Sequence, residues 1–166
     1  MTLHPIQRVA KFASNALIGV AATGLVAMTI IIGWQVIGRF ILGSSPSWSE
    51  QAAQVLMIWF AFLAAAAGVR EGFHIRIVAL EEAASPRIRR LMQLSASLVV
   101  AGCGLAMLIL GGELVMRTWD HTIPSLGMSR GFAYLGLPIS GALIVLFEIE
   151  RMFFPAPQPE ATVVIE

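Results

Sequence analysis

Charge is what this sequence most lacks. Charged residues make up 13% of its 166 positions, whereas soluble domains carry about 25%. Hydrophobic residues make up 57%, and the mean hydropathy is +0.80. Because so little polar surface cannot coat a globule in water, we expect a membrane protein that contacts the lipid bilayer. The formal net charge of +1 gives no indication of nucleic-acid binding.

Cysteine and histidine are also scarce. Cys103 is the only cysteine, which excludes an intrachain disulfide and a CxxC metal site. The three histidines, His4, His74 and His121, lie outside the apolar runs, so paired histidines cannot ligate a haem inside the membrane. P-loop, GxSxG and HExxH motifs are missing as well. The sequence therefore favours a protein that is not an enzyme and has no cofactor.

Four apolar runs lie between charged residues, at 12–38, 51–69, 91–112 and 131–147. A helix needs about 20 residues to cross a hydrocarbon core of ~30 Å, and the runs lack the period-2 alternation of membrane β-strands. We therefore predict an all-α membrane protein. Its domain, residues 1–154, contains four transmembrane helices at about 12–41, 48–70, 87–117 and 131–154.

The arginines and the single lysine favour one orientation. If both termini are cytoplasmic, the inner side carries eight basic residues and the outer side three, as the positive-inside rule requires. Between the second and third helices, Gly72–Ala84 mixes apolar and charged residues, which predicts a short amphipathic segment on the inner surface. The tail, Pro155–Glu166, contains three prolines, and we expect it to be disordered and cytoplasmic.

Ionisable residues stay near the ends of the predicted helices. Glu113 precedes Arg117 by four residues, which predicts an i,i+4 ion pair. We expect Glu148 and Glu150, at the inner end of the fourth helix, to face water. A transporter that works alone usually places a charge or a broken helix near the bilayer midplane. The sequence therefore argues against an autonomous carrier.

Two features are candidates for contacts with a partner. Ala61, Ala65 and Gly68 belong to a block of small residues that lets the second helix approach another backbone closely. This block serves either packing within the bundle or docking to a larger protein. At the outer edge, Arg39 and Glu50 either form an ion pair that locks the first turn or reach water separately.

Four stretches together resemble the small membrane subunit, of DctQ type, of TRAP (tripartite ATP-independent periplasmic) transporters. They are WQVIGRF on the first helix, WSEQ and WFAFLAAAAGVREGFHIRI on the second, and LGMSRGFAYLGLPISGAL on the fourth. The resemblance covers roughly residues 8–152. The residues that match its pattern are Gln35, Arg39, Trp48, Glu50, Trp59, Arg70, His74, Leu126, Gly127, Tyr134 and Pro138. Departures from the pattern are Gln51, Ala64 and Ser129.

The resemblance implies a multi-pass protein of the bacterial inner membrane. It implies a non-catalytic subunit that buttresses a large membrane subunit of a sodium-coupled organic-acid importer and helps form the outer docking surface for a periplasmic substrate-binding protein. Substrate and sodium would bind to the large subunit. The candidate interface residues on this chain are Gln35, Arg39, Trp48, Glu50, Trp59, Ala61, Ala65, Gly68, Arg70, His74, Tyr134 and Pro138.

Two other functions remain open. A stand-alone four-helix exporter should show a carboxylate deep in a helix, and a membrane-anchor subunit of another complex, such as a redox enzyme, should show paired intramembrane histidines. The sequence shows neither feature, so we favour the transporter subunit.

Overall fold

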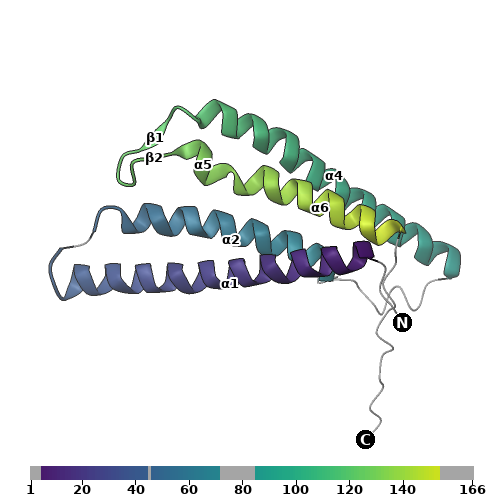
Figure 1. Cartoon of the computed structure of the whole chain (residues 1–166), viewed down its shortest axis with the longest axis horizontal. Helices are drawn as coiled ribbons and strands as arrows, with labels where there is room; N and C mark the ends of the chain where they lie inside the picture. The colour runs from purple at the N-terminus through teal and green to yellow at the C-terminus, as the bar shows by residue number, and fades with distance from the viewer. Residues whose placement is uncertain (1–4, 45, 72–84, 154–166) are drawn as a thin grey trace, which may run out of the picture.

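A computed structural model describes residues 5–44, 46–71 and 85–153 of the chain (Figure 1). Long helices dominate this part of the molecule, and two short strands join in one antiparallel pair. In chain order, the elements are α1 (Pro5–Phe40), α2 (Ser49–Glu71), α4 (Pro86–Thr118), β1 (Thr122–Ile123), β2 (Met128–Ser129), α5 (Arg130–Tyr134) and α6 (Gly136–Phe153).

The helices form two antiparallel pairs that lie against each other. α1 packs along α2, α4 packs along α6, and contacts between α2 and α6 join the two pairs. The pairs diverge toward one end of the bundle (Figure 1). We call this the hairpin end, because the turn after α1 and the β1–β2 pair lie there. The opposite end, where α1 begins and α6 ends, is the terminal end.

In the described part of the chain, four helical segments are long and apolar enough to cross a membrane. They are Gln7–Phe40, Ser49–Glu71, Arg87–Thr118 and Arg130–Met152. Large apolar side chains, among them Leu25, Ile30 and Leu98, are exposed on their outer faces, as helices in lipid require. The predicted fold class, an all-α protein with four transmembrane helices, is confirmed.

Close backbone approach holds the second pair together. A Cβ atom on Gly141 would lie 2.6 Å from the carbonyl oxygen of Gly104 and 2.6 Å from the backbone nitrogen of Leu108. A Cβ atom on Gly104 would lie 2.8 Å from Cγ2 of Ile144. Only glycine therefore fits at this crossing of α4 and α6, which is the packing that small residues allow between membrane helices.

The apolar core lies toward the terminal end. Ala66 and Val69 of α2 meet Ile144 and Phe147 of α6, and all four are buried. Partly buried residues of α1 and α4 pack around this cluster. All four long helices therefore contribute to the core at the end where the two pairs converge.

The fourth span is not one continuous helix. Its predicted range, 131–154, is divided between α5 and α6, with Leu135 between them. Pro138 explains the break, because proline has no N–H to donate to the carbonyl of Tyr134, four residues earlier. At the break itself, the backbone N–H of Leu135 donates to the carbonyl oxygen of Phe132, three residues earlier, at 3.3 Å.

The turns of the hairpin end use glycine where the backbone requires it. Gly127 closes the β1–β2 turn with a φ of 65°, and Gly43 follows α1 with a φ of 64°. Both values lie in the left-handed region that glycine adopts without strain. Within β1–β2, Thr122 is opposite Ser129 and Ile123 is opposite Met128.

The start of the first helix differs from the predicted one. α1 begins at Pro5 rather than at residue 12, because Arg8 and Lys11 continue the helix as a charged first part. The hydroxyl of Ser49 donates to the carbonyl of Pro46 at 2.8 Å. The amphipathic segment 72–84 and the tail 155–166 lie outside the described residues.

Candidate functional sites at the two ends of the bundle

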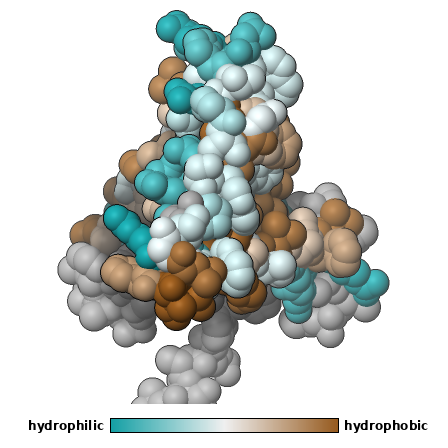
Figure 2. Space-filling model, turned by 90° about the vertical axis from the view of Figure 1, so that its left-hand side faces the viewer, coloured by the Kyte–Doolittle hydropathy of each residue, from teal (hydrophilic) through white to brown (hydrophobic). Residues whose placement is uncertain are grey.

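The hairpin end exposes polar residues next to apolar ones. Figure 2 looks at this end and shows hydrophilic and intermediate residues running down its middle, with hydrophobic residues beside them. Arg39, Trp48 and Glu50, which the sequence places at one edge of the membrane, are all exposed here. No ion pair between Arg39 and Glu50 occurs in the described part of the chain. Of the two alternatives for these residues, the structure therefore supports the one without a mutual contact.

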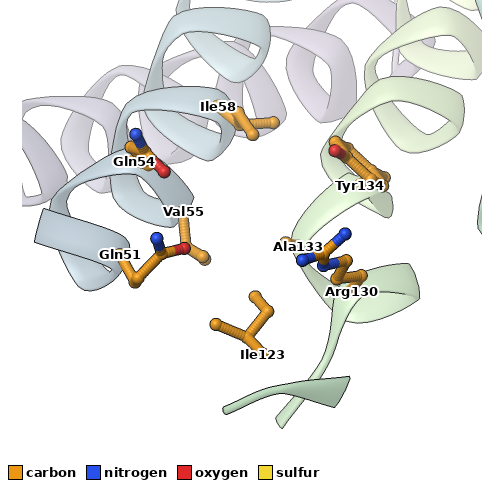
Figure 3. Close-up of a pocket in the computed structure, with 8 residues that line it drawn as sticks. All are labelled: Gln51, Gln54, Val55, Ile58, Ile123, Arg130, Ala133 and Tyr134. Carbon is orange, nitrogen blue, oxygen red and sulfur yellow. The ribbon is translucent and has the colours of Figure 1, made fainter. Parts of the chain in front are cut away.

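A cleft lies between the two helix pairs at this end (Figure 3). Its volume is about 270 Å³. Gln51 and Gln54 extend from α2 on one side, and Arg130 and Tyr134 extend from α5 on the other. The remaining lining residues are apolar: Val55, Ile58, Ile123 and Ala133.

The polar side chains of the cleft have no partners within the described residues. The side chains of Gln51, Gln54, Arg130 and Tyr134 form no hydrogen bond or ion pair with any described residue. Together they offer a guanidinium with five N–H donors, two amides and one phenol. Arg130 is the only charged residue of the lining. The cleft therefore presents an excess of hydrogen-bond donors and a positive charge.

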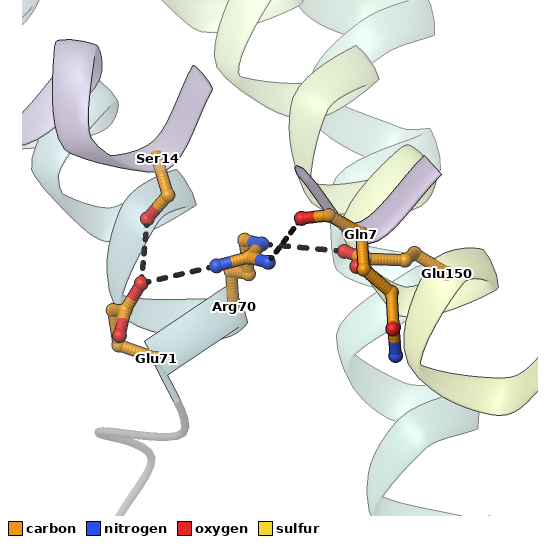
Figure 4. Close-up of polar contacts among 5 residues, drawn as sticks. All are labelled: Gln7, Ser14, Arg70, Glu71 and Glu150. Carbon is orange, nitrogen blue, oxygen red and sulfur yellow. Dashed lines mark hydrogen bonds and ion pairs between the residues drawn. The ribbon is translucent and has the colours of Figure 1, made fainter. Parts of the chain in front are cut away.

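The terminal end carries a polar network that joins three helices (Figure 4). Arg70 of α2 donates from Nε to Glu150 of α6 at 3.3 Å, and from Nη2 to the carbonyl oxygen of Gln7 in α1 at 3.2 Å. Its Nη1 also contacts Glu71 at 3.3 Å. The hydroxyl of Ser14 donates to the same Glu71 carboxylate at 2.9 Å. This network links α1, α2 and α6 where their spans end.

Burial makes this network part of the fold rather than of the surface. The Arg70 and Glu150 side chains are 16% and 12% exposed, and Ser14 is fully buried. Hydrogen bonds to charged groups contribute about 1.5–3 kcal/mol when their partners are shielded from water. Arg70, a candidate for contact with a partner, therefore lies within the chain's own network.

Glu148 and Glu150 do not face water, so the prediction of two solvated carboxylates is wrong. Glu148 is 1% exposed, and its Oε1 lies 3.8 Å from Nη1 of Arg151. Its Oε2 has no hydrogen-bond partner among the described residues. The helix turn that carries both glutamates packs against the convergent end of the bundle, where Phe147 belongs to the core. Glu148 lies near the end of α6 and not at the middle of the span.

At the hairpin end, the predicted ion pair between Glu113 and Arg117 is confirmed. Oε1 of Glu113 lies 2.6 Å from Nη2 of Arg117. The two side chains are 48% and 75% exposed, so water screens the interaction and it contributes little to stability.

The small residues of α2 divide between two faces. Ala66 and Ala67 are buried inside the bundle. Ala61 and Ala65 are exposed, and Gly68 is half-buried. The block therefore serves internal packing on one face and leaves small residues on the other, which is the arrangement that close docking of another helix needs.

The aromatic and proline candidates lie between helices. The rings of Trp59 and Phe132 are 5.7 Å apart and tilted by 37°, which holds α2 against α5. The indole Nε1 of Trp59 and the Oε1 of Gln35 are buried and without hydrogen-bond partners in the described residues. Pro138 packs against Gly111, where an added Cβ would lie 3.1 Å from its Cδ. Tyr134 lines the cleft.

His74 lies outside the described residues. Within the ranges that the structure describes, no group of three His, Cys, Asp or Glu residues is arranged to hold a metal ion.

Sequence reasoning missed the role of Arg130 and the network partners of Arg70. In the sequence, Arg130 is a single charge between two apolar runs, and its position across from Gln54 depends on how the two helix pairs diverge. Ser14 and Glu71 are 57 residues apart and Arg70 and Glu150 are 80 apart, so no local spacing signals either contact.

Comparison with known proteins agrees with the resemblance read from the motifs. The profile of the family described as tripartite ATP-independent periplasmic transporters, DctQ component, matches residues 28–156. This range begins within α1 and extends past the end of α6, so the match covers most of the spans.

Individual relatives are similar at low identity. The sialic acid TRAP transporter small permease protein SiaQ of Vibrio cholerae is 23% identical over 129 residues, which are 78% of this chain and 75% of that protein. A putative TRAP transporter small permease protein of Haemophilus influenzae is 24% identical over 149 residues, 89% of this chain and 91% of its own. The C4-dicarboxylate TRAP transporter small permease protein DctQ of V. cholerae is 30% identical over 98 residues, 59% of this chain and 39% of that protein.

Proposed function

Because the chain belongs to the DctQ family of small TRAP transporter subunits, we propose that it buttresses the large membrane subunit of a sodium-coupled organic-acid importer. It is a multi-pass protein of the inner membrane and a transporter component rather than an enzyme. Small permease subunits of this family are not known to bind cofactors. In the proposed complex, sodium and substrate bind to the large subunit.

The distribution of charged residues along the helices is the observation that favours a structural role for this chain in the transporter. In the sequence, no charged residue lies between Lys11 and Arg39 of α1 or between Glu50 and Arg70 of α2. The later spans carry no charged residue between Arg90 and Glu113 or between Arg130 and Glu148. An ion or an anionic substrate crossing these helices would need polar partners at the midplane. A chain without them is suited to hold another subunit in place.

The names of relatives support the proposed substrate class. Two of them carry the names of sialic acid and C4-dicarboxylates, and both kinds of compound are carboxylates. An organic acid is therefore the proposed substrate of the complex. The selectivity for one acid would reside in the large subunit and the periplasmic binding protein.

The exposed small face of α2 is the proposed contact with the large subunit. Ala61, Ala65 and Gly68 present little side-chain bulk there. Ala65→Leu should weaken co-purification of the large subunit by about tenfold or more, because the leucine separates the two backbones. Ala106→Leu, at an exposed position of α4, is the matched control. Equal recovery of the large subunit with both variants would remove this face from the interface.

The hairpin end is the proposed docking surface for the binding protein. The excess of basic residues on the side of the termini supports an orientation with the hairpin end in the periplasm. Arg39, Trp48 and Glu50 are then exposed to the compartment where a binding protein arrives.

Uptake in cells tests the function as a whole. The large subunit and the binding protein would be expressed with and without this chain, and accumulation of radiolabelled organic acids measured in sodium and in potassium buffer. We expect uptake only with the chain present and only in sodium. Uptake without the chain would contradict the supporting role, and equal uptake in potassium would contradict sodium coupling.

A further inference from the structure

We propose that the cleft at the hairpin end binds a single phosphate group through Arg130, Gln54 and Tyr134. This site is additional to the proposed role in transport and does not depend on it. The group would come from a phospholipid headgroup or from free phosphate, and the membrane setting favours the lipid.

The donors of the cleft match the chemistry of a phosphate. A phosphate offers several oxygens in different directions, and the cleft supplies donors from two opposite walls (Figure 3). The guanidinium of Arg130 binds phosphate oxygens in a bidentate manner, while an amide and a phenol satisfy the others. No carboxylate lines the cleft, so nothing in the lining opposes an anion.

The four polar side chains are also free to bind. Gln51, Gln54, Arg130 and Tyr134 make no side-chain hydrogen bond or ion pair within residues 5–44, 46–71 and 85–153. At the same end, Arg117 is already paired with Glu113. Arg130 is therefore the cation of this cleft that remains available to a ligand.

The depth of the cleft points to the lipid headgroup. Trp48 precedes α2 and Trp119 follows α4, and their side chains are 42% and 51% exposed. Exposed tryptophans at the ends of spans mark the interface between membrane and water. Gln51 and Arg130 lie within the first turns of α2 and α5 at this same end. Phospholipid phosphates are concentrated at that depth.

The apolar part of the lining can contact the beginning of a lipid acyl chain. Val55 and Ile58 follow Gln51 and Gln54 along α2, and Ala133 faces them from α5. Along α2, the lining thus passes from Gln51 and Gln54 to the apolar walls formed by Val55 and Ile58. A headgroup phosphate at Arg130 would place the beginning of an acyl chain against these walls.

Native mass spectrometry of the full chain in mild detergent tests the site. The chain would be titrated with phosphatidylglycerol, and the apparent Kd compared for the wild type, Arg130→Gln, Tyr134→Phe and the control Arg117→Gln. Loss of the charged donor should weaken binding by about tenfold or more. Tyr134→Phe should weaken it by a few-fold, and Arg117→Gln should bind like the wild type.

Three further probes define the ligand. Diacylglycerol lacks the phosphate, so it should bind more weakly than phosphatidylglycerol and without dependence on Arg130. Oleate replaces the phosphate with a carboxylate, which can still pair with Arg130 but offers fewer oxygens to the other donors, so it should also bind more weakly than phosphatidylglycerol. Free inorganic phosphate in large excess distinguishes the source. Phosphatidylglycerol that stays bound in its presence identifies a lipid site, whereas displacement that depends on Arg130 identifies a site for free phosphate. Unchanged phosphatidylglycerol binding by Arg130→Gln, or equal binding of diacylglycerol or oleate, would overturn the proposal.

Discussion

The two ends of the bundle differ in whether their polar side chains are paired within the chain. At the terminal end, hydrogen bonds and ion pairs join three helices through one network, which consists of Ser14, Arg70, Glu71 and Glu150. At the hairpin end, the polar side chains of α2 and α5 face a cleft and have no partners in the described residues. The helix pairs converge at the first end and diverge at the second (Figure 1).

This difference distinguishes the polar contacts that stabilise the fold, at the terminal end, from the polar groups that can bind other molecules, at the hairpin end. Buried polar groups are costly unless paired, so the terminal end needs its network once the helices converge. Polar groups at an open end can instead be satisfied by water, headgroups or another protein. The comparison predicts that substitutions at the terminal end lower stability and that those at the hairpin end affect binding.

Arg70→Ala should have the largest effect on stability. It removes the contacts with Glu150 and with the Gln7 carbonyl, and it leaves a mostly buried carboxylate without its cation. We expect a loss of about 2–3 kcal/mol in the free energy of unfolding, measured by steric trapping or denaturant titration in detergent.

Arg117→Ala is the matched control at the hairpin end, because it also removes one arginine from an ion pair. Its partner, Glu113, is 48% exposed, so the expected loss is about 0.5 kcal/mol or less. Equal losses for Arg70→Ala and Arg117→Ala would contradict the distinction between the two ends.

Ser14→Ala should have an intermediate effect. The fully buried hydroxyl donates to Glu71 at 2.9 Å, and its removal should cost about 1 kcal/mol. The same unfolding measurement checks it, with Ser95→Ala as the control, since the Ser95 hydroxyl is exposed and bonds only within its own helix. A loss for Ser95→Ala as large as that for Ser14→Ala would count against a network that joins α1 to α2.

Glu50→Ala should change stability least, by about 0.5 kcal/mol or less, because the side chain is exposed and unpaired in the described part of the chain. In the proposed complex it should still reduce uptake by roughly a few-fold, through weaker docking of the binding protein. Glu113→Ala removes an acidic charge from the same end and serves as the control. Normal uptake by Glu50→Ala would remove this residue from the docking surface.

Much of the fold could be predicted because apolar length is a strong signal. Runs of about 20 residues between charges identify the four spans, and small residues identify helices that approach closely. The division of the fourth span was not predicted, although Pro138 was visible, because membrane helices often tolerate proline. Which glycines face inward, such as Gly104 rather than Gly102, depends on the crossing of α4 and α6.

The candidate sites were less accessible to sequence reasoning. The pair Glu113–Arg117 was predictable because both residues lie on one helix face. The contact between Arg70 and Glu150 joins residues from different helices, and the burial of Glu148 depends on the convergence of the bundle. The cleft exists only because the two helix pairs diverge, which no periodicity in either pair indicates.

The central claim is that this chain works as one subunit of a larger membrane complex. A tagged version of the full chain should be purified in mild detergent from its native membranes, and its partners identified and quantified by mass spectrometry. We predict that the large TRAP membrane subunit co-purifies at about one copy per copy of this chain. Recovery of the chain alone as a homo-oligomer would contradict the claim and favour a small transporter that acts by itself.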